Sequence, residues 1–576
     1  MCQQNLRNRV SYTALYATGT PGNATAGTQM AATYFSYDIH GNVDTLLQDY
    51  GSSDSASTQN PMNISGNRFK KMSYYYDLIS GKVNSVAYQP NQPDAFYHKY
   101  NYDAENRLTE VETSNDKIVW EKDAQYFYYR HGPLSRIVIG QNQVQGIDYA
   151  YTIQGWLKGI NSTSVKNGIF DMGKDGKIGS NNSNVARDAY GISLNYFTGD
   201  YKQINLISPA FTGSMFNLNN IDANTVAHPL FNGNIASMFV NIPKLGDAYL
   251  YGYKYDQLNR LNSMDVFKGF VDTINNWATT PQPTADYKER IIYDPNGNIK
   301  NYLRNGTTQG GTQQTMDQMA YRYKPGTNQL DHVIDAVPAT HYSIDIDNQD
   351  TLNYTYDQIG NLTQDVAENI TTIEWTVYGK ISKIEKSNGT NITYCYDASG
   401  NRISKTIIPS SGDTTSTHYV YDASGNVMSI YTHDTAINSG DLTQIEVHKY
   451  GSSRLGIYNT KINMEHLVEN TDCIYLVTRG NMNYQATDHL GNVLVTVSDK
   501  KIQVRDATDT TKVGYYTADV INASGLTPFG MEMFGRKFHV GSGSYRYGFG
   551  GKEKSNEIYG EANAYDFGDR IQDPRL

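Results

Sequence analysis

The residues of this chain best suited to metal chemistry lie in one short acidic stretch. Asp171 and Asp175 belong to the segment Asp171-Met172-Gly173-Lys174-Asp175-Gly176, and carboxylate oxygens are ligands that Ca²⁺ prefers. The segment lacks the spacing of an EF-hand and has no glutamate at the closing position. We therefore interpret it as an Asp/Gly turn, with a calcium site as the alternative.

A second polar group, Asp488-His489, has the residue types of a catalytic acid–base pair. Neighbours on a strand or turn point in different directions, and no serine or cysteine nucleophile motif accompanies them. Gly491-Asn492 follows, which is typical of a turn. The twelve histidines and three cysteines show no metal-binding or disulfide spacing. The sequence predicts no cofactor.

A repeat of Tyr-Asp followed by a turn must position these groups. In Tyr-x-Tyr-Asp the rings fall on one strand face, the Asp can accept bonds from backbone amides two residues on, and the following Gly-Asn can close a hairpin loop. A lone hairpin is marginal in water, so we expect the hairpins to stack into a long antiparallel sheet. The repeat turns carry Asp38, Asp103, Asp256, Asp294, Asp357, Asp397 and Asp422.

Composition supports a repeat array. The chain has 576 residues, 48 of them Tyr against 17 Phe, and 18% are charged; this length exceeds that of most single cores. A net charge of -10 argues against nucleic-acid binding, and no apolar window is long enough to span a membrane. Residues 161–247 interrupt the repeat, and we expect an excursion from the sheet there.

The C-terminal stretch 484–576 carries a specific resemblance. Four segments of it closely resemble the Rhs repeat-associated core that closes bacterial Rhs/YD-repeat proteins. They are Asp488-His489-Leu490-Gly491-Asn492, Pro528-Phe529-Gly530 and the stretches 545–554 and 568–576. Two short motifs are similar to those of Rhs proteins from Bacteroidetes. They are Gln154-Gly155-Trp156-Leu157-Lys158-Gly159 and Gly551-Lys552-Glu553-Lys554. The toxin-complex C subunits and the teneurins are related families.

The resemblance implies an all-β fold in which a long antiparallel sheet of YD-repeat hairpins spirals into a hollow shell, or cocoon. Residues 1–483 would form the shell and 484–576 the core that closes it. Both ends of the chain look cut, and the core stops at Asp573-Pro574-Arg575-Leu576, where family members continue.

The resemblance also implies a protease, since related cores act as intramolecular aspartyl-type proteases that cut just beyond the core. Such hydrolysis needs one protonated and one ionised carboxyl group. Ser555 stands where relatives carry an Asp, which leaves Glu553, Asp566 and Asp569 as degenerate candidates. We expect no enzymatic activity and favour a structural plug.

Two functions follow from the resemblance and remain open. The first is a secreted or cell-surface shell that encapsulates a C-terminal polymorphic toxin and delivers it in competition between cells. The alternative is a surface adhesion protein that binds a glycan or protein partner and carries no toxin. Expected partners are the enclosed toxin segment, or a chain covering the open shell end, and components of a secretion system.

Overall fold

The structure is a computed structural model that describes residues 3–16, 29–51, 60–203, 209–211, 227–308, 314–466, 478–541, 544–568 and 570–576. Among these residues the fold is all-β, and the one α-helix is α1 (Asn556–Tyr559). None of the described helices is long and apolar enough to cross a membrane. The chain divides into two units, each built from two or more separate stretches of sequence.

Unit 1 contains residues Met1–Gln125, Asn369–Asn483 and Gly568–Arg570. Every described pairing within it is antiparallel and joins strands that follow one another in sequence. Its strands are β1 (Tyr12–Tyr16), β2 (Gln29–Tyr37), β3 (Val43–Asp49), β4 (Phe69–Tyr76), β5 (Val83–Tyr88), β6 (Phe96–Tyr102), β7 (Leu108–Ser114), β22 (Ile370–Trp375), β23 (Ile381–Lys386), β24 (Asn391–Tyr396), β25 (Arg402–Ile408), β26 (Thr415–Tyr421), β27 (Val427–His433), β28 (Thr443–Tyr450) and β29 (Arg454–Asn463).

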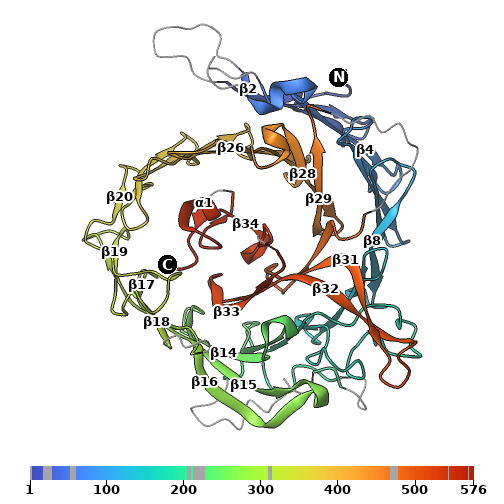
Figure 1. The fold of residues 1–576 in the computed structure, drawn as a ribbon, viewed down its shortest axis with the longest axis vertical. Helices are drawn as coiled ribbons and strands as arrows, with labels where there is room; N and C mark the ends of the chain where they lie inside the picture. The colour runs from blue at the N-terminus through green and yellow to red at the C-terminus, as the bar shows by residue number, and fades with distance from the viewer. Residues whose placement is uncertain are drawn as a thin grey trace. The chain divides into compact units, whose positions relative to one another are not determined.

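Unit 2 contains residues Tyr126–Glu368, Tyr484–Phe567 and Ile571–Leu576. Its strands β14 to β18 follow one another along the sheet (Figure 1). Its strands are β9 (Leu134–Ile139), β10 (Gln145–Tyr151), β11 (Leu157–Ile160), β12 (Gly191–Asn195), β13 (Ser237–Asn241), β14 (Tyr249–Tyr255), β15 (Leu261–Val271), β16 (Asn276–Tyr293), β17 (Ile299–Asn305), β18 (Thr315–Tyr323), β19 (Leu330–Asp335), β20 (Tyr354–Tyr356), β21 (Leu362–Asp365), β31 (Val493–Arg505), β32 (Val513–Leu526), β33 (Glu532–His539), β34 (Glu553–Lys554), β35 (Tyr565–Asp566) and β36 (Ile571–Gln572). Strands β8 (Glu121–Tyr128) and β30 (Met482–Thr487) contain two of the points where the chain passes from one unit to the other.

The turn of each repeat is built as the sequence predicts. In the copy at Asp294, one carboxylate oxygen accepts a bond from the Asn298 amide at 2.9 Å and the other from the Asn298 side chain at 2.9 Å. Gly297 adopts a φ of 96°, the left-handed region that glycine tolerates without strain. Equivalent side-chain bonds form at Asp38, Asp103, Asp256, Asp357, Asp397 and Asp422.

The tyrosine of the Tyr-Asp word joins each hairpin to the one before it. The Tyr293 hydroxyl donates to the carbonyl of Leu261 at 2.8 Å, and Leu261 opens the returning strand of the preceding hairpin. Phenylalanine could not make this bond, which explains the excess of Tyr over Phe. Other tyrosines of Tyr-Asp words make the same kind of bond in the pairs Tyr37–Val10, Tyr76–Val43, Tyr102–Val83, Tyr255–Ile235, Tyr356–Leu330, Tyr396–Ile381 and Tyr421–Arg402. Tyr323 and Tyr450, which precede Lys324 and Gly451, bond to the carbonyls of Ile299 and Val427 in the same way.

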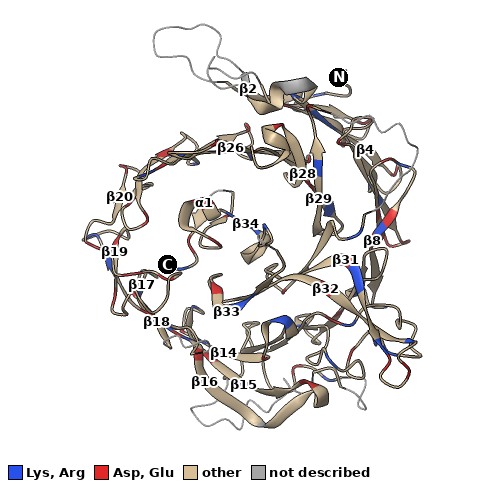
Figure 2. Cartoon of the chain, in the orientation of Figure 1, with Lys and Arg blue, Asp and Glu red and all other residues tan. Residues whose placement is uncertain are grey.

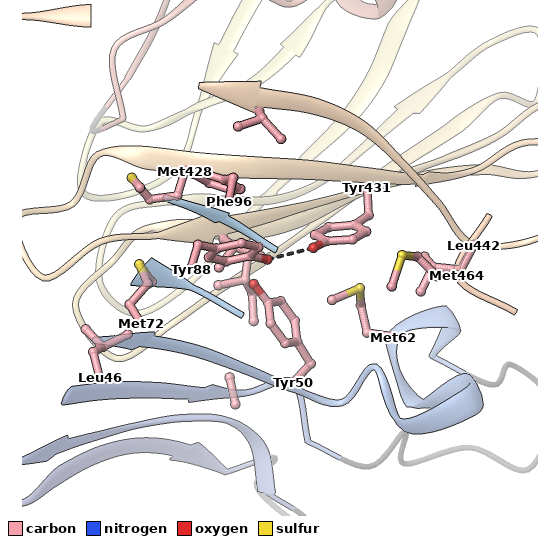
Figure 3. Close-up of a cluster of buried hydrophobic side chains, with 14 of the residues drawn as sticks. Leu46, Tyr50, Met62, Met72, Tyr88, Phe96, Met428, Tyr431, Leu442 and Met464 are labelled. Carbon is pink, nitrogen blue, oxygen red and sulfur yellow. Dashed lines mark hydrogen bonds between the residues drawn. The ribbon is translucent and has the colours of Figure 1, made fainter. Parts of the chain in front are cut away.

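The two runs of strands in unit 1 share one hydrophobic core (Figure 3). Met72 and Tyr88 from the first run pack with Met428 and Tyr431 from the second, and all four are nearly inaccessible to solvent. The Tyr88 and Tyr431 hydroxyls lie 2.6 Å apart. Burial of large apolar side chains on one face holds the two runs together, while the hydroxyls satisfy one another.

The sheet continues through part of the stretch 161–247, where an excursion was expected. β12 pairs with β11 and β13 with β14, so two strands in this stretch extend the sheet on either side. The expected boundary between 483 and 484 coincides with a passage between units, but residues 484–567 form one unit with 126–368. The Rhs-like core is therefore not a separate packing unit.

Charged side chains of both signs lie interspersed along the strands of each unit (Figure 2). Several oppositely charged pairs are almost completely buried, including Lys70–Asp94, Lys158–Asp200 and Arg304–Asp317. A buried charge without a partner is strongly destabilising. Where buried carboxylates outnumber the cationic side chains that contact them, a further ligand is therefore expected.

Candidate functional site

Two of the protease candidates come together in the small sheet β34–β36. Glu553 and Asp566 lie directly opposite one another in the antiparallel pair β34–β35, so their side chains share a face. Arg546 donates to Glu553 at 3.1 Å and compensates its charge. Aspartyl hydrolysis pairs one protonated with one ionised carboxyl group, and the ion pair with Arg546 engages one oxygen of Glu553. Asp569 lies outside the described residues.

Ser555 occupies a closed position rather than a site open to substrate. It is fully buried, its amide donates to the Ala564 carbonyl at 2.9 Å, and its hydroxyl has no partner among the described residues. The residue begins α1 without capping it through its side chain.

A second group of carboxylates surrounds Arg575 and was missed at the sequence level. Arg575 donates to both oxygens of Asp573, at 3.0 and 2.7 Å, and to Glu368 at 2.6 Å. Burial raises the pKa of the neighbouring Asp365 to about 6, and the Glu368 and Asp573 charges contribute to the rise. The motif Asp573-Pro574-Arg575 was visible in the sequence. The partner of Arg575, Glu368, is 207 positions away and could not be inferred from it.

The end of the chain is anchored within unit 2. Leu576 packs against the cluster of Tyr302, Met319 and Val333, and the C-terminus lies beside β17 and β19 (Figure 1). Apolar contact and the Arg575 ion pairs together fix the last four residues to strands β16 to β21.

Asp488 is a turn residue, as the sequence predicts. Its carboxylate accepts bonds from the amides of Leu490 and Asn492 and from the Asn492 side chain, at 2.7 to 3.0 Å. This is the geometry of the repeat turns. Asp488 and His489 also line a cavity of about 170 Å³ with Tyr251, Tyr253 and Met264.

The acidic stretch at Asp171 forms part of a buried cluster. Asp148 on β10 lies opposite Arg136 on β9, and the loop between β11 and β12 brings Asp171, Asp175 and Asp188 to them. One carboxylate oxygen each from Asp171, Asp175 and Asp188 lies within 4.8 Å of the others. The sequence candidates Asp171 and Asp175 are thus joined by Asp188, which no spacing rule had indicated.

Asp171 does make the predicted Asp turn. Its two oxygens accept bonds from the amides of Gly173 at 2.9 Å and Asp175 at 2.5 Å. The turn is buried, however, with Asp171 7% exposed and Asp175 0% exposed. A surface turn would not need to exclude its carboxylates from water, so the turn interpretation alone is incomplete.

Arg136 is the cation that contacts this cluster directly. It binds Asp148 through Nη1 and Asp175 through Nη2, the latter at 2.5 Å. Burial raises the pKa of Asp175 above its ordinary 3.8, and the Asp171 charge adds to the rise. Burial and the Asp171 charge likewise raise the pKa of Asp188. In a dry site these carboxylates cannot all carry charge unless a cation joins them.

A second buried cluster contains Asp317, Asp335 and Asp345 beside Arg304. Arg304 binds Asp317 through Nε at 2.6 Å, and its Nη1 and Nη2 have no partner among the described residues. One oxygen each of Asp317, Asp335 and Asp345 also lacks a described partner. The two clusters differ in the donors left on the arginine, since Arg136 has only Nε without a described partner.

Known proteins resemble this chain in fold and not in sequence. No model of a protein family matches it, and no curated protein does. The crystal structure of TcdB2-TccC3 is similar with a TM-score of 0.59 and 13% identity, over 98% of this chain and 24% of that one. TcdB2-TccC3 without its hypervariable C-terminal region gives 0.58 and 12%, over 98% and 25%.

A Photorhabdus luminescens Tc holotoxin pore carrying a TccC3 mutation gives a TM-score of 0.58 and 12% identity, over 98% of this chain and 24% of that one. The chain therefore has the fold of these Tc toxin chains over nearly its whole length and spans about a quarter of theirs. At this level of identity, the likeness extends to the fold. The all-β, antiparallel prediction is confirmed.

Proposed function

We propose that this chain forms part of a β-shell that encloses a polypeptide toxin and delivers it to another cell. The observation that carries the proposal is the match of 98% of the chain to TcdB2-TccC3. One of the matching structures is described as lacking a hypervariable C-terminal region. The resemblance of residues 484–576 to the Rhs repeat-associated core supports the same assignment.

The local structure suits a protein wall. Each hairpin bonds its neighbours through the strand ladders and through a tyrosine hydroxyl placed on the preceding turn. Such a repeat needs no separate core in each unit, since stacking supplies it. We propose that its cargo is a toxin polypeptide and that the protein acts outside the producing cell.

The core is proposed to be a plug rather than a protease. Arg546 neutralises Glu553, and Arg575 clamps Asp573 through two bonds. Ser555 stands where relatives carry an Asp and supplies no carboxyl group for the pair that aspartyl hydrolysis needs.

The intact mass of the protein from its native source, compared with its full reading frame, tests the delivery proposal. A cargo segment should be recovered with the shell and should resist added protease until the shell is unfolded. Recovery as a separate fragment would show that the core cleaves and refute the plug. A native protein with no segment to enclose, or a segment digested as fast as free peptide, would refute encapsulation.

The adhesion alternative rests on the loops between β11 and β14, which leave the sheet twice. Replacing the exposed Ile178 and Phe231 of these loops by Ser should weaken binding to target cells if these loops hold the partner. The same replacements should leave an encapsulated cargo protected, so the two functions predict different results.

A further inference from the structure

We propose that the loop between β11 and β12 binds a hard divalent cation, Ca²⁺ by preference, through Asp171, Asp175 and Asp188. The proposal is independent of the toxin-delivery function. It rests on the distances between three carboxylates, on buried oxygens that lack partners, and on an imbalance of buried charge.

The distances fit a single ion. Ca²⁺ binds oxygens at about 2.3–2.6 Å, so two of its ligands can be at most about 5.2 Å apart. The three carboxylate oxygens lie within 4.8 Å of one another. Three ligands leave room for water or backbone oxygens, which complete the shell in many calcium sites.

Two carboxylate oxygens of the cluster lack a protein partner. Asp188 is 7% exposed; one oxygen accepts from Gln145 at 2.9 Å, and the other accepts from no described residue. Asp175 is 0% exposed; one oxygen binds Arg136, and the other has no described partner. Buried polar atoms are almost always satisfied, so open oxygens on two acids of one cluster indicate a missing ligand.

The charges have the sign that a cation would correct. Asp148, Asp171, Asp175 and Asp188 are four buried carboxylates, and one guanidinium, Arg136, contacts them. Isolated buried charges are too costly to retain, so such groups are paired, protonated or bound to a metal. Carboxylate ligands without sulfur or imidazole favour hard cations such as Ca²⁺ over Zn²⁺.

The surrounding backbone is shaped around these carboxylates. A Cβ on Gly146 would collide with Asp175 Oδ2 and with Arg136, and a Cβ on Gly173 would collide with Arg136 and Asp148. Both glycines therefore make room for the acids. The loop's far end is fixed where Arg187 bridges to β32, with its amide donating to the Tyr516 carbonyl at 2.9 Å. A bound ion would tie this loop to β9 and β10.

Calcium titration of the wild-type chain is the first test and requires no variant. After dialysis against a chelator, calorimetry should show binding of Ca²⁺, with Mg²⁺ binding more weakly. Thermal unfolding should move to higher temperature in millimolar Ca²⁺ than in chelator, because a ligand that binds only the folded state stabilises it. Absence of both binding and shift would overturn the proposal.

Asp188→Asn locates the ion, and Asp345→Asn in the second acidic cluster is the matched control. Asp188→Asn should lose the bound ion and the calcium-dependent shift in unfolding temperature. In chelator it should unfold at a temperature no lower than that of the wild type, because one of the carboxylates that repel one another is gone. Asp345→Asn should keep both. An ion retained by Asp188→Asn, or lost by Asp345→Asn alone, would place it elsewhere and reject this site.

Discussion

Lys70 on β4 is the most sharply testable element of unit 1. Its ammonium donates to Asp94 at 2.6 Å, and the side chains of both residues are 0% exposed. Tyr431 donates to the same carboxylate oxygen at 2.5 Å, and the ammonium lies 4.3 Å from the centre of the Tyr431 ring. Burial lowers the pKa of Lys70 despite the Asp94 charge, so desolvation outweighs the attraction between them.

Replacing Lys70 by Met should destabilise unit 1 by about 3–5 kcal/mol, because it leaves the Asp94 charge buried and uncompensated. Methionine fills much of the lysine volume, so cavity formation adds little. In the double variant Lys70→Met/Asp94→Asn the amide oxygen can still accept the Tyr431 bond. We therefore expect that variant to recover about 2 kcal/mol or more of the loss.

Hydrogen–deuterium exchange of the β4 and β5 peptides measures the opening free energy of this region without requiring two-state unfolding of the whole chain. The matched control is Lys99→Met, since Lys99 forms an equally short pair with Glu112, 2.7 Å, on the surface. That variant should change the opening free energy by less than about 1 kcal/mol. Equal losses of opening free energy in Lys70→Met and Lys99→Met would refute the reasoning. A double variant with a lower opening free energy than Lys70→Met alone would refute it as well.

Three further predictions concern unit 2 and the repeat. Tyr293→Phe should lower the opening free energy of β15 to β17 by about 0.5–1.5 kcal/mol in hydrogen exchange, whereas exposed Tyr75→Phe should have no effect; equal effects would deny the hydroxyl its role. Burial raises the pKa of Glu289 to about 7 from an ordinary 4.5, so the native state holds a proton there that the unfolded chain loses, and wild-type stability should fall from pH 4.5 to 7. Glu289→Gln should make that decline in urea midpoints shallower, since other buried carboxyl groups still contribute, and an unchanged pH slope would contradict it. Bonds from Asn298 lower the pKa of Asp294 below its ordinary 3.8, so its stabilisation is present above pH 3.8 and lost below it. Asp294→Asn should flatten that acid dependence in thermal unfolding, and a variant as acid-sensitive as wild type would argue against it.

The repeat could be read from the sequence because its forces are local. The Tyr-x-Tyr alternation sets the strand faces, and the Asp at each turn bonds groups two to four residues away. Hairpins of this kind are encoded in a short window, which is why the turn residues and the antiparallel sheet were predicted correctly. That the tyrosine hydroxyl donates to the preceding hairpin is shown by the structure.

Chemistry that depends on distant residues was not readable in the same way. Asp171 and Asp175 were visible as an acidic stretch, but Asp188 joins them only because the chain folds back toward β9 and β10. Glu553 and Asp566 were named as candidates, yet only the strand register set them opposite one another and only Arg546 showed that Glu553 is neutralised.

The sequence by itself thus determined the strand, the turn and the all-β class, since each follows from periodicity and from contacts within a few residues. Tertiary structure alone decided which charged groups are brought together, as with Arg575 and Glu368, 207 positions apart. The physical reason is that burial and charge compensation depend on which faces meet, and that choice is made by the whole chain. A four-residue turn at Asp171 would look the same in sequence whether it ended in water or beside Asp188.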